Sequence, residues 1–157
     1  MTGFDFSITY LSQCLDALRR TPCERVCRLK RILVVDDERS ITFALQQYFA
    51  YAGFWVDCAW SGEEAQRYLA ANQYDVAIVD VELRDGGAGV DGIDLAAFIR
   101  NSAPGTAVII LTAVTCADTR RRAEEAGVRS YLSKPARLAH VADIAIGLIE
   151  RGTAAGQ

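Results

Sequence analysis

The fold is decided by two short stretches: residues 32–37, which read ILVVDD, and residues 76–80, which read VAIVD. Each contains four consecutive apolar residues, most of them β-branched, and ends in aspartate. Residues 107–112, AVIILT, repeat the apolar run but end in threonine. Continuous apolar runs of this length are typical of parallel strands buried on both faces. The sequence therefore predicts three strands at the centre of a parallel sheet.

Outward from these runs, short β-rich segments alternate with amphipathic segments from residue 30 to residue 151. This alternation is typical of an α/β protein, a doubly wound parallel sheet with helices on both faces. We expect one domain over residues 30–152, an N-terminal extension over residues 1–29 and a short tail over residues 153–157. The expected strands are residues 32–36, 55–60, 76–80, 107–112 and 130–132. The expected helices are residues 40–52, a helix beginning at Ser61, and residues 92–101, 117–126 and 137–151.

Local signals support these helices. In the first, Ile41, Leu45, Tyr48 and Ala52 form an apolar stripe, and Gly53 supplies a left-handed stop. The second opens with a capping box, Ser61 followed by Glu64. Gly127 is expected to terminate the helix over residues 117–126, whose arginines and glutamates predict a solvated, internally paired surface.

The last helix carries two apolar stripes, and one is enough for packing on a sheet. The surplus predicts either a wide core helix or a partner surface. The first stripe is Leu138, Val141, Ala145 and Leu148, and the second is Ala139, Ala142, Ile146 and Ile149.

The N-terminal extension predicts a short helix with an apolar seam that ends before Pro22. It could dock on the domain, pair two chains or be poorly ordered, so a homodimer through this segment or through the last helix is an open alternative. The seam residues are Phe4, Ile8, Leu11, Leu15 and Leu18.

Composition excludes several classes of function. The 157 residues are 51% hydrophobic and 24% charged, and no apolar run approaches the ~20 residues of a membrane helix. A net charge of −3 gives no general attraction to nucleic-acid phosphates. Five scattered cysteines argue against a disulfide framework. We therefore expect a cytoplasmic protein that neither binds nucleic acid directly nor enters a membrane.

Polar residues follow the predicted strands at the edge where parallel sheets bind ligands. They are Asp36 and Asp37, Asp80, Thr112 and Ala113, and Lys134. Clustered carboxylates repel one another and invite a hard cation, for which Mg²⁺ is the best match. Asp80 is then the candidate nucleophile for phosphoryl transfer, with Lys134, the Thr112 hydroxyl and the Ala113 N–H offsetting charge on the transferred group.

These residues resemble the receiver domain of two-component response regulators, over about residues 30–151. Asp36 and Asp37 match the acidic pair of that family, Asp80 its phosphoacceptor, Thr112 its switch hydroxyl, and Lys134 its lysine motif. The resemblance implies a flavodoxin-like (βα)5 fold with strand order 2-1-3-4-5. It also implies Mg²⁺-dependent transfer from a phosphohistidine on a sensor histidine kinase or a histidine phosphotransfer protein, followed by slow loss of the phosphoryl group to water.

Further roles follow only from this resemblance. The backbone carbonyl of Glu82 is expected to complete the metal shell, and the side chains of Glu82 and Val114 to tune dephosphorylation. Tyr131 matches an aromatic residue that moves with Thr112, although a plain core role is equally compatible with its position. The chain, taken as a stand-alone, chemotaxis-regulator-like receiver, is expected to signal through contact with an unknown protein target and not to act as an enzyme on other substrates.

The sequence departs from the family pattern after Asp80. Arg84 occupies the place of a usual proline, and Asp91 and Gly92 arrive late, so the loop over residues 84–90 is expanded. Its glycines indicate either a flap beside the acceptor or a tolerated insertion.

Other functions on the same fold remain as alternatives. An aspartyl-phosphate hydrolase needs a second aspartate two residues after the nucleophile, where this chain has Glu82. A flavin-binding module needs a phosphate-binding loop after the first strand, where this chain has Asp36 and Asp37. A protein-binding module that is not phosphorylated is the third alternative.

Overall fold

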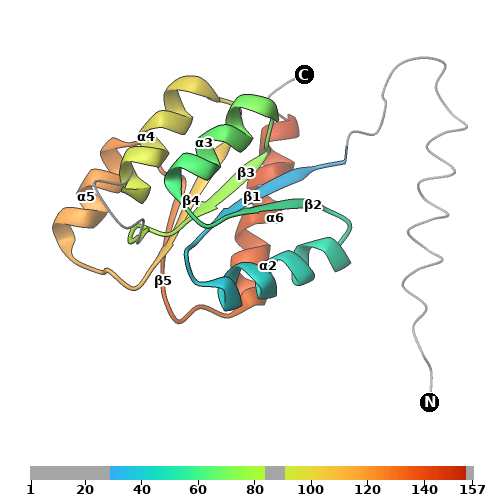
Figure 1. The fold of residues 1–157 in the computed structure, drawn as a ribbon, viewed down its shortest axis with the longest axis horizontal. Coiled ribbons are helices and arrows are strands. Elements are labelled where there is room, and N and C mark those ends of the chain that lie inside the picture. The colour runs from blue at the N-terminus through green and yellow to red at the C-terminus, as the bar shows by residue number, and fades with distance from the viewer. Residues whose placement is uncertain (1–28, 84–90, 155–157) are drawn as a thin grey trace, which may run out of the picture.

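The computed structural model describes residues 29–83 and 91–154. Five parallel strands form one sheet in the order β2-β1-β3-β4-β5, with helices on both faces (Figure 1). The strands are β1 Arg31–Val35, β2 Trp55–Ala59, β3 Val76–Val79, β4 Ala107–Thr112 and β5 Ser130–Ser133. The helices are α2 Arg39–Tyr51, α3 Gly62–Ala71, α4 Gly92–Ser102, α5 Ala117–Glu125 and α6 Leu138–Ala154. The predicted flavodoxin-like fold is confirmed.

Three predicted features fall wholly or mostly outside the described residues. They are the helix and seam of the N-terminal extension, the expanded loop over residues 84–90, and residues 155–157 of the tail. None of the helices in the described ranges has the length and apolar character required to span a bilayer.

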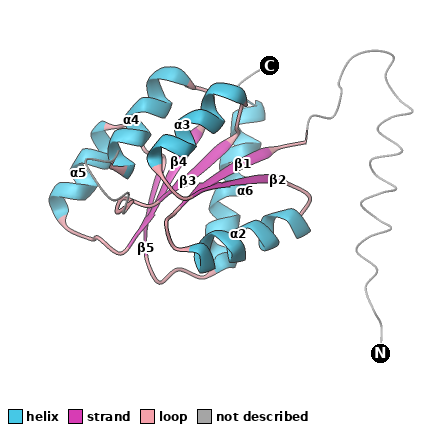
Figure 2. Cartoon of the chain, in the orientation of Figure 1, coloured by secondary structure: helices cyan, strands magenta, loops and turns pink. Residues whose placement is uncertain are grey.

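The sheet separates two hydrophobic cores because alternate strand residues point to opposite faces. Leu33, Val35 and Val79 belong to the core beneath α3, α4 and α5. Ile32 and Val34 belong to the core beneath α2 and α6. Figure 2 shows the two helical layers on either side of the strands. Burial on both faces is the physical reason for the uninterrupted apolar runs of the central strands.

The register of the central strands places the candidate site. Val35 of β1 pairs with Val79 of β3, so Asp36 and Asp80 leave the sheet at the same level. The Asp80 N–H still donates to the Val35 carbonyl at 2.9 Å. The strand register therefore fixes the positions of the backbone from which the polar side chains after β1 and β3 extend.

The apolar stripe predicted for α2 is only partly right. Leu45 is buried as expected, whereas Tyr48 and Ala52 are exposed. The buried face instead runs through Thr42, Leu45 and Phe49. Phe49 has no polar group to satisfy, so it takes the core position that the sequence assigned to Tyr48.

The predicted helix ends agree more closely. Gly53 and Gly127 have φ angles of +89° and +80°, the left-handed conformation expected of helix stops. The Ser61 hydroxyl accepts from the Glu64 N–H at 3.1 Å. The Glu64 carboxylate reaches one residue beyond the cap, to the N–H of Trp60 at 2.9 Å.

The last helix is longer than predicted and its wide apolar surface is largely core. It passes Arg151 and ends at Ala154, inside the segment expected to be a tail, because Gly152 keeps a helical backbone. Both stripes contribute buried residues, Val141 and Ala145 from one and Ala142 and Ile149 from the other. This burial favours the wide-core interpretation.

Phe49 tests the core beneath α2. It is fully buried and packs edge-on against Phe54 at 6.0 Å between ring centroids. Phe49→Ala should lower the free energy of unfolding, measured with urea, by about 3–5 kcal/mol. The control Tyr51→Ala removes an aromatic ring that is 97% exposed on the same helix and should cost about 0.5 kcal/mol or less. Equal losses would show that the core is misplaced.

Candidate functional site

Three carboxylates meet at the carboxyl end of the sheet. Asp36 and Asp37 follow β1, and Asp80 follows β3. One oxygen from each lies within 4.8 Å of the other two. Asp36 and Asp80 are buried and Asp37 is half-buried. The predicted acidic cluster is therefore present, on segments that are remote in the sequence.

Lys134 lies between two of these carboxylates. Its Nζ is 2.6 Å from Asp36 Oδ2 and 2.6 Å from Asp80 Oδ2. Burial alone would lower the pKa of the Lys134 ammonium, but its hydrogen bonds to the two carboxylates outweigh this effect and raise the pKa. Burial raises the pKa of the Asp36 carboxyl, and the hydrogen bond from Lys134 offsets only part of that rise. The Lys134 side chain is therefore favoured in its protonated form, with its ammonium held between Asp36 and Asp80.

The second oxygen of each buried aspartate is held by its own loop. Asp36 Oδ1 accepts from the Glu38 N–H at 2.9 Å, and Asp80 Oδ1 accepts from the Glu82 N–H at 3.2 Å. These are turns in which an aspartate caps the backbone two residues ahead. Within the described ranges, no donor reaches the carboxylate of Asp37. Asp37 is therefore the carboxylate most available to a ligand.

The charge of the cluster suits a hard cation. Three ionised carboxylates and one ammonium leave a formal charge of −2 in a partly buried site. Two like charges about 4 Å apart cost roughly 4 kcal/mol at an effective dielectric of 20. Mg²⁺ takes oxygen ligands and needs only one or two carboxylates, since water and phosphate oxygens complete its shell. The residues present fit such an ion.

Gly92 packs directly on the backbone of Asp80. The Gly92 N–H donates to the Val81 carbonyl at 3.1 Å. A Cβ at position 92 would lie 1.8 Å from the Asp80 carbonyl oxygen, so only glycine fits. Asp91 caps α4 by accepting from the Ile93 N–H at 3.0 Å. Gly92 thus packs closely on the backbone that follows β3.

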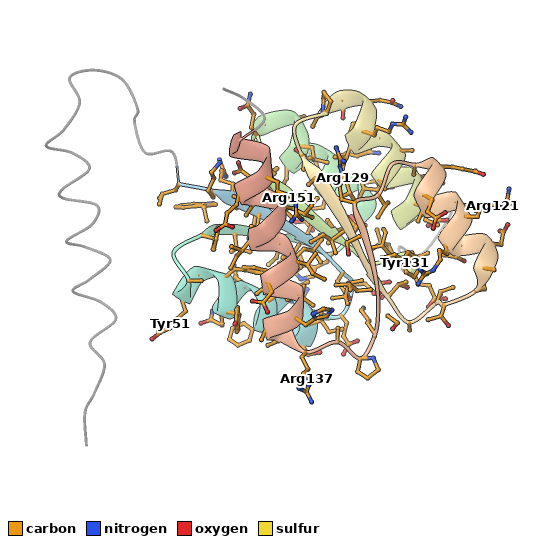
Figure 3. All side chains as sticks on the ribbon, turned by 180° about the vertical axis from the view of Figure 1, so that it is seen from behind. Tyr51, Arg121, Arg129, Tyr131, Arg137 and Arg151 are labelled. Carbon is orange, nitrogen blue, oxygen red and sulfur yellow. The ribbon has the colours of Figure 1, made fainter. Side chains whose placement is uncertain are left out.

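A short hydrogen-bonded chain links Thr112 to Tyr131. The buried Thr112 hydroxyl accepts from the Val114 N–H at 3.2 Å, and the Tyr131 hydroxyl donates to the Val114 carbonyl. Burial raises the pKa of Tyr131, which favours the neutral hydroxyl that this bond needs. Ala113 follows Thr112 on the surface. Tyr131, labelled in Figure 3, is half-buried and partly packed on the core.

The three arginines of α5 make contacts with different partners. The prediction of a uniformly solvated, internally paired surface is therefore wrong in part. Only Arg121 pairs within the helix, with Asp118 at 2.7 Å and Glu125 at 3.4 Å. Arg122 instead bonds Asp91 at the start of α4, at 3.0 Å. These contacts depend on the approach of α4 to α5, which the local pattern of charges does not reveal.

The side chain of Arg120 contacts β5 and not its own helix. Its guanidinium lies 5.0 Å from the centroid of the Tyr131 ring, within the range of a cation–π contact. Figure 3 shows Arg121 at the outer surface of the molecule and Tyr131 farther in.

Residues 32–145 match the model of the response regulator receiver domain family. The chain belongs to this family. Response regulator MprA of Mycobacterium sp. (strain KMS) is 31% identical over 105 residues, which are 67% of this chain and 44% of that regulator. The receiver domain spans about half the length of the curated relatives that it matches.

Solved structures agree with this fold. A CheY-like receiver domain protein from Methanospirillum hungatei JF-1 is 23% identical, with a TM-score of 0.75 over 80% of this chain and 97% of that one. A response regulator from Burkholderia pseudomallei, crystallised with a phosphorylated aspartic acid, calcium ion and citrate, is 26% identical. Its TM-score is 0.66 over 71% of this chain and 64% of that one.

The receiver domain brings together the predicted residues to different degrees. Asp36, Asp37, Asp80 and Lys134 form one cluster. Glu82 contributes its N–H to Asp80, while its side chain is exposed. Sequence reasoning missed the contact of Gly92 with the backbone of Asp80 and the stacking of Arg120 on Tyr131. The only signal for the first was the glycine itself.

Gly92→Ala should deform the backbone at Asp80. The added methyl group would overlap the Asp80 carbonyl, so we expect the free energy of unfolding to fall by about 1–3 kcal/mol. Gly105→Ala is the matched control because its methyl group meets no atom within 4 Å, and it should shift the value by no more than about 1 kcal/mol. Urea titrations of both variants measure the difference, and a harmless Gly92→Ala would refute the close packing.

Proposed function

We propose that this receiver domain is a phosphoacceptor switch in which Asp80 receives a phosphoryl group from a phosphohistidine. The donor would be a sensor histidine kinase or a histidine phosphotransfer protein. The observation that carries the proposal is the position of Lys134 Nζ, 2.6 Å from both Asp36 and Asp80 at the ligand-binding edge of the sheet. The phosphorylated aspartic acid of the Burkholderia pseudomallei regulator supports it.

In the proposed transfer, an Asp80 carboxylate oxygen forms a bond to phosphorus while the phosphorus–nitrogen bond of the donor breaks. The electron pair of that bond stays on the imidazole nitrogen, which takes up a proton. The ammonium of Lys134 offsets negative charge on the transferred group, and the Thr112 hydroxyl and the Ala113 N–H donate to its oxygens. The domain would then promote the transfer by positioning these groups and by neutralising charge on the phosphoryl group.

Asp36, Asp37, Asp80 and the backbone carbonyl of Glu82 would hold Mg²⁺ beside the acceptor. When bound, the ion supplies charge neutralisation for the phosphoryl oxygens. The acidic cluster and the unengaged Asp37 carboxylate support this assignment. The crystal structure of the Burkholderia pseudomallei regulator also contains a hard cation, calcium.

The proposed output is a change of contacts near α5. The Thr112 hydroxyl would turn from the Val114 N–H toward the phosphoryl group and release one end of the chain that leads to Tyr131. Arg120 on the Tyr131 ring extends this chain to α5. A downstream protein that reads this surface would then distinguish the two states by differential affinity. Slow hydrolysis of the Asp80 acyl phosphate would reset the switch, with no turnover of other substrates.

Substitution of the acceptor tests this function. Wild-type protein incubated with acetyl phosphate and Mg²⁺ should gain one phosphoryl group by intact-mass spectrometry. Asp80→Asn should gain none because the amide is not a nucleophile, whereas the control Asp143→Asn, exposed on α6, should behave as wild type. If Asp80→Asn gains a phosphoryl group to the same extent as wild type, Asp80 is not the acceptor. Steady release of phosphate from esters would favour the hydrolase alternative.

Mg²⁺ should stabilise the folded receiver domain through Asp37. At a concentration 100-fold above its dissociation constant, the ion is expected to raise the free energy of unfolding by about 2.7 kcal/mol. Asp37→Asn should remove this increment, and should stabilise the metal-free protein because it relieves repulsion among the carboxylates. Denaturation with Mg²⁺ and with EDTA measures both effects. An increment that survives the substitution would place the ion elsewhere.

A further inference from the structure

Large apolar side chains are exposed mainly on one edge of the domain. The described residues include seven exposed large apolar side chains. Six of them lie just before β1, on α2, on β2 or directly after β2, and the seventh is Phe98 on α4. Tyr51 is 97% exposed and points away from the end of α2 in Figure 3. The six are Leu29, Phe43, Tyr48, Tyr51, Trp55 and Trp60.

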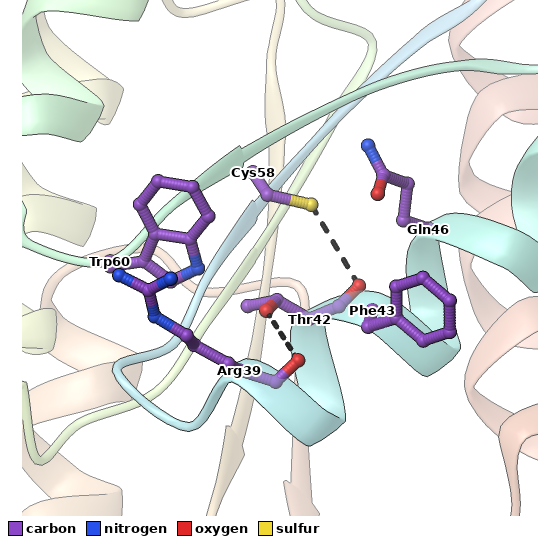
Figure 4. A pocket seen from close by; sticks show the side chains of 6 residues that line it. All are labelled: Arg39, Thr42, Phe43, Gln46, Cys58 and Trp60. Carbon is purple, nitrogen blue, oxygen red and sulfur yellow. Dashed lines mark hydrogen bonds between the residues drawn. The ribbon is translucent and has the colours of Figure 1, made fainter.

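A groove lies within this edge, between α2 and the end of β2 (Figure 4). Phe43 stands on one side and Trp60 on the other, and the guanidinium of Arg39 lies 4.8 Å from the centroid of the Trp60 ring. Phe43 and Trp60 are 63% and 40% exposed. The lining residues are Arg39, Thr42, Phe43, Gln46, Cys58 and Trp60.

The floor of the groove carries no ionised group. The Cys58 Sγ lies 3.7 Å from the Thr42 carbonyl oxygen, to which it donates. Burial raises the pKa of Cys58 to about 11, with the Asp57 and Glu64 charges adding to the effect, so the thiol is neutral at physiological pH. A neutral thiol behaves as a small apolar group. The groove therefore offers an apolar floor between two aromatic walls.

Size indicates what kind of occupant fits. The groove has a volume of about 210 Å³, below the ~300 Å³ at which small-molecule sites begin. It lies beside the edge strand β2, whose outer side pairs with no other described strand. A few side chains from an apolar helix fit this shape better than a cofactor.

We propose that the N-terminal segment of the same chain, residues 4–18, docks in this groove through its apolar seam. The seam presents leucine, isoleucine and phenylalanine at steps of four and three, the spacing of a helix that fills a groove. On such a helix Asp5 and Asp16 lie together beside the seam, and the lining of the groove includes the cation Arg39, so the two charges are complementary.

The tether favours docking within one chain. Residues 19–28 connect the seam to Leu29 and can span up to about 35 Å, enough to reach across a small domain. Leu29 enters beside this edge, since the carbonyl of the next residue, Lys30, accepts from the Trp55 N–H at 2.9 Å. A short tether gives an effective concentration in the millimolar range, above that of a second chain in dilute solution.

Tryptophan fluorescence of the full chain tests the docking. The chain has two tryptophans, so Trp55→Phe leaves Trp60 of the groove as the sole reporter. In this background, Leu11→Asp with Leu15→Asp should expose Trp60, with a red-shifted emission maximum and stronger acrylamide quenching. The control Thr9→Asp with Gln13→Asp adds the same charge on the opposite side of the predicted helix and should leave both signals unchanged.

Two results would refute docking of the segment within one chain. Identical Trp60 signals in the three proteins would show that the groove is empty and overturn the proposal. Sedimentation equilibrium should give the monomer mass at all concentrations. If the burial of Trp60 instead appears only with a dimer mass, the occupant is a second copy and docking within one chain is refuted.

A variant on the groove side gives an independent test. Phe43→Ser should speed amide hydrogen exchange across residues 4–18, because it removes one aromatic wall. Gln47→Ser, on an exposed position one turn farther along α2, should not. Equal exchange in wild type and Phe43→Ser would contradict the proposal even if the seam variants fold poorly.

Discussion

The contact on which the site depends is the ammonium of Lys134 between Asp36 and Asp80. These residues are 98 and 54 positions away from Lys134 in the chain, and the three side chains are only 16%, 4% and 9% exposed. A buried ion pair adds little net stability, because desolvation consumes most of the Coulombic gain, but breaking one is costly. Its effect here is to fix where β1, β3 and the segment after β5 meet.

From this contact a continuous set of interactions runs around the rim. The glycine at the start of α4 packs on the backbone of Asp80, and the cap of α4 binds an arginine of α5. Another arginine of α5 stacks on the tyrosine of β5. The hydroxyl of that tyrosine and the hydroxyl of the threonine at the end of β4 both bond to the backbone of Val114. Asp80 is thus linked to α5 through the start of α4, and Thr112 is linked to α5 through Tyr131. In order, the residues are Asp80, Gly92, Asp91, Arg122, Arg120, Tyr131, Val114 and Thr112.

Much of this architecture could be predicted because the signals are local or topological. Four apolar residues in a row identify a central strand, and a parallel sheet must gather the residues that end its strands, so Asp36, Asp80 and Lys134 were expected to meet. What could not be predicted depends on rotation and on contacts between layers. The choice of Phe49 over Tyr48 for the core, and the contact of Arg122 with another helix, leave no local pattern in the sequence.

The central claim is that Lys134 and Asp80 are energetically coupled in the folded protein. A double-mutant cycle with Lys134→Met, Asp80→Asn and the combined variant measures this coupling through the free energy of unfolding without metal. A coupling energy of about 1 kcal/mol or more is predicted, within the range of directly contacting groups. Single effects that add to within about 0.3 kcal/mol would contradict the contact on which the site is built.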